Sequence, residues 1–442
     1  KQDFPAEEGN TEAIVGENID LIGLLKGKMS MRVIAVALII SLIGVFAMTL
    51  FAADGPEYGG RYTKERIANL RSNIEKYDWA AGRRDSIVAE AEWWVNKSDD
   101  ELWEMIPGQT IGRTIDTTMT NKRPGVEEVR IHKCPVCGDD ITEYGNYPWI
   151  VNPKERPWKI ECPSCGTVFP TNDFEAYWRS GRDETGVFDP TQADKSLLYN
   201  TEHPDPDDPK HTWGVDDGYG WTDEDGIEHR FVAYYAWRHW QHLKSGLGAL
   251  SQAYMYTGNP KYAHKAGVMF DRIADLYPDM DFSEYGLKRG WYHSAGGSGR
   301  GKIEGRIWES GTVRNWGQYY GMVRSGLHGQ PDLYEFLAQK GEEYELPTEK
   351  GSYERLRDNI ETNAIQEGVE AVFEGDVRAN EGGNQLSILY CAVALNRDPL
   401  TTEWIDWCFR EGRAGTGEGG HIPQLVVGEI DPGPAGTVEA LA

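Results

Sequence analysis

Four cysteines form the clearest chemical pattern in the sequence. Cys134-Pro-Val-Cys137-Gly and Cys162-Pro-Ser-Cys165-Gly are two matching knuckles. Thiolates two residues apart, with a glycine that lets backbone N–H groups approach the sulfurs, are typical of a tetrahedral Zn²⁺ site. All four sulfurs would bind the ion and leave no position for substrate, so the pattern predicts a structural Zn²⁺. Two disulfides are the alternative in an oxidising compartment.

Three polar clusters farther along interrupt the apolar pattern. The first spans 291–301, the second 308–320 and the third 378–385. They supply imidazole, guanidinium, carboxamide, carboxylate and phenol groups, which can move protons or stabilise negative charge. The candidate catalytic residues are Asn384, Gln385, His293, Tyr319, Tyr320 and Arg314. The candidate substrate-binding residues are Arg378, Trp221, Glu309 and Trp316.

Most of these residues also have a structural interpretation. Asn384 could cap its helix, Arg314 and Glu309 could form an ion pair that closes a loop, and the tyrosines could be core aromatics. His239 and His242 lie three residues apart, a spacing seen in metal sites. Because tryptophans flank both histidines, packing is the preferred interpretation.

Amphipathic helices dominate the rest of the chain. Apolar residues recur at helical spacing through 62–77, 87–94 and a short helix that begins after 98–100 and ends at Pro107-Gly108. The pattern returns after residue 230, where Thr257-Gly-Asn-Pro260 predicts a tight turn between two antiparallel helices. Further helices fit 311–327, 353–373 and 385–395.

Repeated helical hairpins with little strand signal predict a mainly α fold, an (α/α) toroid with an inserted four-cysteine zinc ribbon. The expected domains are N-terminal helices at 54–130, the ribbon at 131–170, an acidic Gly/Pro-rich loop at 171–229 and the toroid at 230–442. The acidic loop could bind Ca²⁺, although its acidic residues lack regular alternate-oxygen spacing.

The N-terminal segment has a targeting pattern. Lys26, Lys28 and Arg32 precede an apolar run over 33–53 that ends in small residues. This predicts a signal peptide at 29–53, with an uncleaved membrane anchor as the alternative. Residues 1–28 are interpreted as a non-native upstream extension. The expected location is secreted or periplasmic, with membrane attachment only if the segment stays uncleaved.

Composition excludes one large class of partner. The chain of 442 residues has 71 acidic and 45 basic side chains and a net charge of −26. A general nucleic-acid binder depends on Lys and Arg against phosphates, so nucleic acid is not an expected partner. The 16 Trp and 22 Tyr instead favour sugar rings, whose apolar faces can lie against aromatic side chains.

The order of these motifs resembles that of the heparinase II/III-like polysaccharide lyases, in a secreted bacterial form with a zinc-ribbon insertion. The resemblance covers most of residues 60–430. It rests on the double CPxCG, the stretches 167–174 and 215–221, the 256–262 hairpin and the Gly383-Asn384-Gln385 helix start. It implies a toroid, a C-terminal β-sandwich and β-elimination of an acidic, uronate-containing polysaccharide.

The chain departs from the family pattern at two places. Family lyases commonly carry Asn-His where this chain has Asn384-Gln385. After Gly419-Gly420 the sequence reaches Pro432 to Gly436 instead of the motif that opens the β-sandwich, so the sandwich is expected to be missing and the toroid truncated.

Two other functions stay open. A glycoside hydrolase on a similar toroid would use Glu309 with Glu374 or Asp376 as its acid and base. A non-catalytic carbohydrate-binding protein would use the zinc ribbon for contacts.

Overall fold

The computed structural model describes residues 57–118, 133–286, 300–377, 379, 382–410, 412 and 419–420. The chain divides into two units, Lys1–Asp54 and Gly55–Ala442, and every described residue belongs to the second. The predicted extension at 1–28 and signal segment at 29–53 lie outside the described residues. Within the described ranges, no helix combines the length and the apolar character that crossing a bilayer requires.

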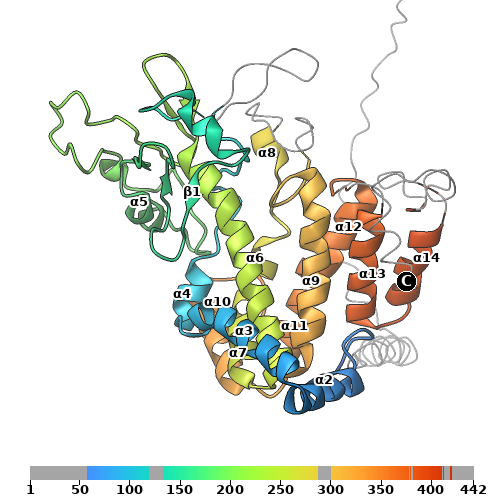
Figure 1. Cartoon of the computed structure of the whole chain (residues 1–442). Coiled ribbons are helices and arrows are strands. Elements are labelled where there is room, and N and C mark those ends of the chain that lie inside the picture. Colours follow the sequence, from blue (N-terminus) through green and yellow to red (C-terminus); the bar gives the residue numbers. More distant parts are fainter. Residues whose placement is uncertain are drawn as a thin grey trace, which may run out of the picture. The chain divides into compact units, whose positions relative to one another are not determined.

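The described chain is mainly helical, as predicted (Figure 1). Its α-helices are α2 Lys64–Lys76, α3 Asp78–Val95, α4 Asp99–Glu104, α5 Phe174–Ser180, α6 Phe231–Thr257, α7 Pro260–Leu276, α8 Ser283–Gly286, α9 Arg306–Leu327, α10 Pro331–Glu343, α11 Tyr353–Asn359, α12 Glu367–Glu374, α13 Gly383–Leu395 and α14 Leu400–Phe409. Its other helical turns are η2 Asp139–Tyr144, η3 Lys195–Leu197 and the π-helix η4 Ile360–Gln366. Its strands are β1 Ile150–Val151, β2 Ile160–Glu161, β3 Val168–Phe169, β4 Trp221–Thr222 and β5 Glu228–His229.

The predicted hairpin of α6 and α7 is built by its turn residues. Gly258 ends α6 in the left-handed conformation (φ 71°), and its N–H donates to the Tyr254 carbonyl at 2.7 Å. The side chain of Asn259 then accepts from the Lys261 N–H, and Pro260 occupies the first turn of α7. A left-handed glycine followed by an Asn cap and a proline reverses the chain within three residues.

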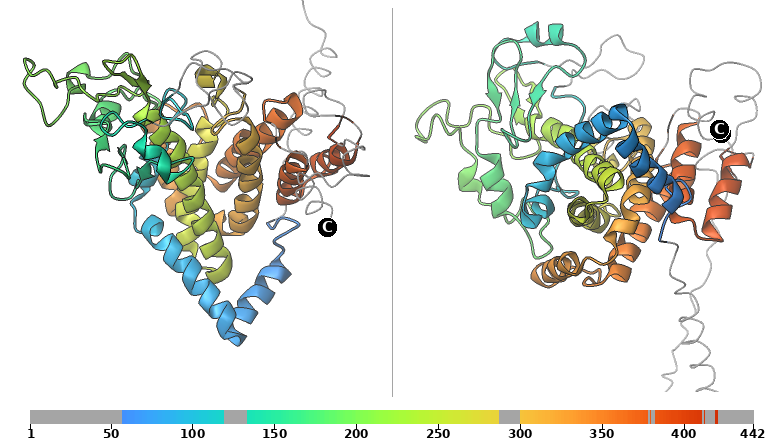
Figure 2. Two further views of the ribbon diagram at one scale, coloured as in Figure 1. Left: turned by 45° about the horizontal axis from the view of Figure 1, so that its top comes forward. Right: turned by 60° about the horizontal axis from the view of Figure 1, so that its bottom comes forward.

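Helices α6, α9 and α13 run parallel and side by side (Figures 1 and 2). Between α6 and α9, Lys244 contacts Thr312 near one end and Tyr254 contacts Ser325 near the other. Between α9 and α13, Gly317 lies so close that an added Cβ would be 2.7 Å from the Cys391 backbone nitrogen. The N-termini of the three helices therefore share one end of the bundle, and α7, η4, α12 and α14 return in the opposite direction.

Helix α6 belongs to two hydrophobic cores. Its first two turns, 231–237, pack with the cysteine-containing region, whereas 240–254 pack with α3, α4, α7, α9 and α13. The inserted region has a three-stranded antiparallel sheet of order β1-β2-β3, in which Ile160 pairs with Val151 and Phe169. The 171–229 segment, predicted as a loop, also contains α5 and the β4–β5 pair.

A buried ion cluster fixes α7 to α11. Lys350 Nζ lies 2.6 Å from both Asp271 Oδ2 and Asp275 Oδ1, and Asn359 Nδ2 donates to both aspartates. The lysine side chain is 2% exposed. Burial and the adjacent Asp271 raise the pKa of Asp275 to about 6, although Lys350 and the nearby Arg272 act to lower it. Lys350 is the cation that forms ion pairs with both buried carboxylates.

We therefore expect Lys350→Met to destabilise the fold strongly. Removing one partner of a buried ion cluster leaves uncompensated charge and costs about 3–5 kcal/mol. The free energy of unfolding in urea measures this loss. Glu349→Gln, which breaks only the exposed pair with Arg355, is the control and is expected to cost less than about 1 kcal/mol. A similar small loss in both variants would contradict the role of the cluster.

Candidate functional site

The four predicted cysteines come together in one cluster. Their sulfurs all lie within 4.8 Å of one another, and the Cys134–Cys165 and Cys137–Cys162 sulfur pairs are both 3.6 Å apart. Four ligands at about 2.3 Å from a tetrahedral Zn²⁺ would be about 3.8 Å apart. A disulfide requires about 2.05 Å. The spacing therefore fits a bound metal ion, and all four cysteines are free thiols.

The two knuckles have similar local structures. Cys134 and Gly138 exchange backbone hydrogen bonds of 3.0 and 2.9 Å, and Cys162 accepts a 2.9 Å bond from Gly166. Both glycines have positive φ, 62° and 75°, which a Cβ would strain. The Val136 N–H donates to the Cys134 sulfur at 3.4 Å. These turns direct the paired sulfurs toward a common point.

Burial separates the cluster from solvent on one side. Cys134 and Cys162 are 2% and 0% exposed, and burial raises the pKa of both thiols. For Cys165, burial acts to raise the pKa, but hydrogen bonds with Thr167, Cys134 and Cys162 outweigh it and lower the pKa to about 7. A divalent cation would deprotonate all four thiols by its own charge. Four sulfur ligands leave no open position, which is the donor set of a structural site.

Three of the candidate residues on α9 lie in the core. Glu309 is 0% exposed and accepts the N–H groups of Ile303 and Glu304 at 2.8 and 2.7 Å. Trp316 is also fully buried. Tyr320 donates to the Glu361 carboxylate at 2.6 Å. These side chains hold α9 to the neighbouring elements and do not face solvent.

The other two α9 candidates are only half-buried. Burial raises the pKa of Tyr319, although the nearby Arg314 guanidinium acts to lower it. The Tyr319 ring packs against α6, where a Cβ added at Gly248 would lie 2.7 Å from its Cζ. The Arg314 Nε atom is buried and has no hydrogen-bond partner. The Tyr319 phenol and the Arg314 guanidinium therefore both lie at the edge of the core.

Of the two candidate residues on α13, one is buried and the other is only half-buried. Gln385 is 5% exposed and its side-chain N–H₂ donates to the Gly420 carbonyl, so it fastens a chain segment. Asn384 is half-buried, and its Oδ1 is buried without a hydrogen-bond partner. It does not cap α13, because Gly382 occupies the N-cap position. Asn384 therefore has a carboxamide that the described residues do not saturate.

The remaining candidates are dispersed or outside the described residues. Trp221 is half-buried on β4, with its ring 5.9 Å from that of Trp213. Asp376 forms an exposed ion pair with Arg300 at 3.3 Å. His293 and Arg378 lie outside the described residues.

One pattern that motif searching overlooks is the distribution of charge among helices. In the whole chain 71 of 442 residues are acidic. Helices α6, α9 and α13 contain a single carboxylate, the fully buried Glu309, although they carry arginines and a lysine. Helices η4, α12 and α14 carry six carboxylates and neither lysine nor arginine. Counting charges by helix, rather than along the chain, would have revealed this segregation.

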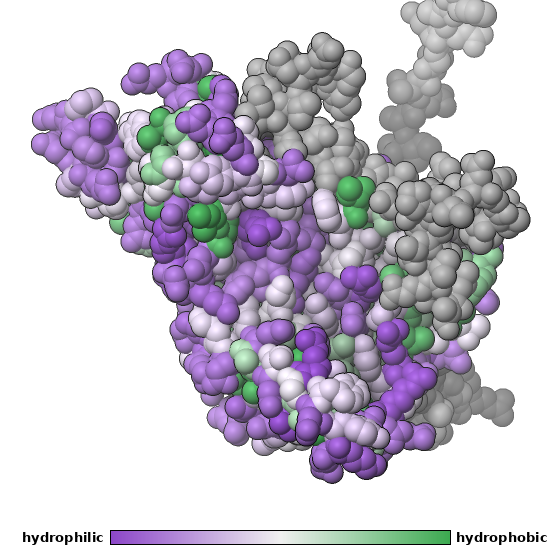
Figure 3. Space-filling view, in the orientation of Figure 1, coloured by the Kyte–Doolittle hydropathy of each residue, from purple (hydrophilic) through white to green (hydrophobic). Residues whose placement is uncertain are grey.

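The solvent-facing residues of α6 and α9 include no acidic side chain; two apolar ones, Ile307 and Trp308, are exposed in the first turn of α9. On α6 they include Arg238, Gln241 and Ser245, which follow one another at helical spacing. On α9 they include Arg314 and Gln318. The surface over the upper half of α6 is hydrophilic (Figure 3).

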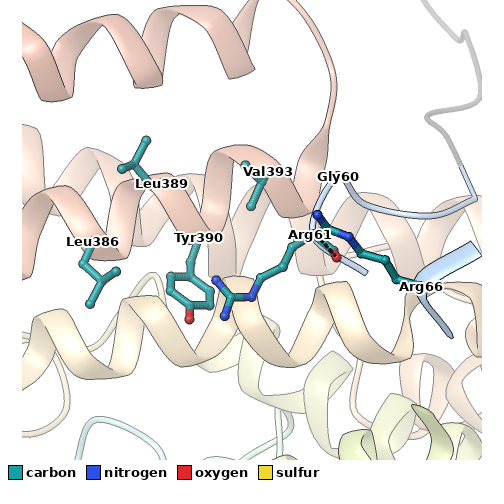
Figure 4. Close-up of a pocket in the computed structure, with 7 residues that line it drawn as sticks. All are labelled: Gly60, Arg61, Arg66, Leu386, Leu389, Tyr390 and Val393. Carbon is teal, nitrogen blue, oxygen red and sulfur yellow. Dashed lines mark hydrogen bonds between the residues drawn. The ribbon is translucent and has the colours of Figure 1, made fainter. Parts of the chain in front are cut away.

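A pocket of about 270 Å³ lies along α13 (Figure 4). The Arg61 guanidinium is 4.5 Å from the Tyr390 ring centroid, and Arg66 donates to the Arg61 carbonyl at 3.0 Å. Leu386, Leu389 and Val393 form the apolar wall. No carboxylate among the described residues lines this pocket, so Arg61, which precedes α2, and Arg66 of α2 place cations beside α13 without an acidic side chain in the lining.

The cysteine cluster generates a direct prediction. Purified chain is expected to hold one divalent ion, and Cys162→Ser is expected to lose it because serine replaces a thiolate ligand with a neutral hydroxyl. Elemental analysis by mass spectrometry measures the stoichiometry. Cys408→Ala removes a buried thiol outside the cluster and should leave one ion per chain. Full metal content in the Cys162 variant would contradict the assignment.

Comparison with protein-family models, with curated proteins and with solved structures gives no match to this chain. The resemblance to the heparinase II/III-like group therefore stays a prediction from the motifs.

Proposed function

We propose that this protein is a secreted polysaccharide lyase that cleaves a uronate-containing polymer by β-elimination. The observation that carries the proposal is the near absence of carboxylates from α6, α9 and α13. A polyanion approaching a chain of net charge −26 is repelled unless one face lacks acidic groups. These three parallel helices supply that face, with Arg238 and Arg314 among its half-buried side chains.

The chemistry requires three groups. Elimination removes the proton at C5 of a uronate, which becomes acidic enough only when the neighbouring carboxylate is neutralised. The carboxamide of Asn384, whose oxygen has no partner among the described residues, and the guanidinium of Arg314 are suited to this role. The phenol of Tyr319 is protonated at neutral pH, as a tyrosine ordinarily is, and is the proposed donor of a proton to the leaving oxygen. His293 is the proposed base.

The hydrolase alternative receives less support. Its acid and base would include Glu309, but that carboxylate is fully buried and accepts two backbone N–H groups. A glycosidase carboxylate must reach the scissile oxygen or a water molecule. Glu309 instead holds residues 303 and 304 at the start of α9.

We further propose that the cysteine cluster holds a structural Zn²⁺ and that the paired helices form part of an (α/α) toroid. The tetrathiolate donor set supports zinc, since it is the ligand set of zinc ribbons. The two antiparallel layers of helices support the toroid. In this arrangement the ion stabilises the inserted ribbon and takes no part in elimination.

The proposal is tested by following two products of the purified full chain on a panel of uronate polysaccharides. Elimination creates a double bond conjugated to the carboxylate, so ultraviolet absorbance should rise together with reducing ends. Reducing ends that form without absorbance would overturn the lyase assignment in favour of hydrolysis. Binding without either product would favour a carbohydrate-binding protein.

Substitutions on the face formed by α6, α9 and α13 test the catalytic role proposed for each side chain. Tyr319→Phe should lower kcat about 10²–10⁴-fold because it removes a proton donor. Asn384→Ala should lower it about 10²–10³-fold because it removes a hydrogen-bonding group from the developing charge. Initial rates of absorbance change measure both effects.

Arg355→Gln is the matched control, because Arg355 lies on α11 in an exposed ion pair and should keep wild-type kcat. Wild-type kcat in both face variants would contradict the proposed site.

A further inference from the structure

A pocket of about 170 Å³ lies where the inserted ribbon meets the helical body. Its walls come from α3, α4, α5 and α6 and from the loop between β1 and β2. At roughly 30 Å³ per water, it holds about six waters, a space close to that of one sugar ring. It contains none of the residues assigned to elimination, so it is a separate site.

His239, which lines this pocket, has a buried hydrogen-bond acceptor. His239 is 6% exposed, and its Nε2 lies 2.8 Å from the Met105 carbonyl oxygen, to which it donates. Burial lowers the pKa of His239 to about 4, so the ring is neutral at pH 7 and its Nδ1 carries a lone pair. That Nδ1 is buried and has no hydrogen-bond partner. A buried polar atom without a partner is costly unless a ligand or water satisfies it.

The rim of the pocket has one cation that no described carboxylate neutralises. Lys97 pairs with Glu101 at 2.7 Å, and Arg179 pairs with Glu175 at 3.0 Å. Lys154 makes no ion pair with the described residues; its Nζ lies 5.3 Å from the Trp93 ring centroid. The pocket therefore has an excess positive charge at Lys154.

Apolar surface completes the pocket. Trp93 is half-buried and Pro157 is exposed, so both offer apolar surface at the opening. Trp158 forms the deeper wall, where its ring packs 5.1 Å from Trp178 and 5.2 Å from Tyr235. An aromatic wall, a buried acceptor and a single cation match a ring that has an apolar face, hydroxyl donors and one carboxylate.

We propose that this pocket binds one uronate residue, with its carboxylate at Lys154 and a hydroxyl donating to His239 Nδ1. The identity of the sugar as a uronate rests on the proposed function. The pocket, Lys154 and the unpartnered Nδ1 of His239 are observed independently of that function. The site would hold a uronate outside the elimination site and against the ribbon. The loop that contributes Lys154, Pro157 and Trp158 leads through β2 to Cys162, so the metal cluster would hold one wall of the pocket in place.

The test measures the binding of small ligands to the full chain by ligand-observed NMR titration. D-glucuronate is expected to bind at least tenfold more tightly than D-glucose, which lacks the carboxylate. It should also bind at least tenfold more tightly than tetrahydropyran-2-carboxylate, which lacks the hydroxyl donors. Equal affinities for glucuronate and either analogue would overturn the proposal.

Substitutions locate the site. Lys154→Gln is expected to raise the Kd for glucuronate at least tenfold while leaving that for glucose unchanged. Lys195→Gln, at an exposed lysine on η3 outside the pocket, is the control and should keep the wild-type Kd. An unchanged Kd in the Lys154 variant would place the uronate elsewhere and overturn the proposal. Because these ligands have no bond to eliminate, their binding is independent of whether the chain is a lyase.

Discussion

The burial of α6 is the constraint on which the rest of the described structure depends. Its first two turns complete the core of the cysteine-containing region, and its later turns lie at the centre of the helical core. At Gly246 an added Cβ would lie 2.2 Å from the Trp94 ring, so α3 packs directly against the α6 backbone. A helix surrounded in this way can carry few charges, because a buried charge without a partner is unfavourable.

That constraint also explains the charge segregation. Apart from the buried Glu309, the three parallel helices carry no acidic residue, whereas the returning helices and the outer helices α2, α3, α4 and α10 do. The one lysine buried on α6, Lys244, is paired with Glu304 and Thr312. What faces solvent on α6 and α9 is therefore set by the few positions that escape packing. These carry arginine, amide and hydroxyl groups, together with the exposed Ile307 and Trp308. The burial of these helices thus limits their acidic residues, and the lack of acidic residues in turn favours an anionic ligand on their surface.

Local features of the fold could be predicted from sequence, and features that depend on long-range packing could not. The CPxCG spacing fixes each knuckle within five residues, and the Thr257-Gly-Asn-Pro260 turn carries its own capping signals, so both predictions are confirmed. Helices α10 and α14 were not predicted. The mainly α class follows from periodicity, whereas the parallel arrangement of α6, α9 and α13 depends on contacts between distant segments.

In the candidate site, too, the features that depend on long-range packing could not be predicted from the sequence. Tyr319 and Tyr320 are neighbours of the same type, yet about 100° of helical rotation puts one at the edge of the core and the other against Glu361. No sequence pattern distinguishes them, because either could belong to the apolar stripe. His239 was correctly interpreted as packed, but its unpartnered nitrogen becomes visible only when Met105 is placed beside it.

The most direct measurement of the central claim, that an acidic chain presents a face for polyanions, is equilibrium binding to polygalacturonan in two forms. The de-esterified and the methyl-esterified polymers share a backbone and differ in charge. The account predicts tighter binding of the de-esterified form, with an affinity that falls as ionic strength rises because salt screens the attraction. Equal binding of the two forms, or preference for the esterified one, would contradict it.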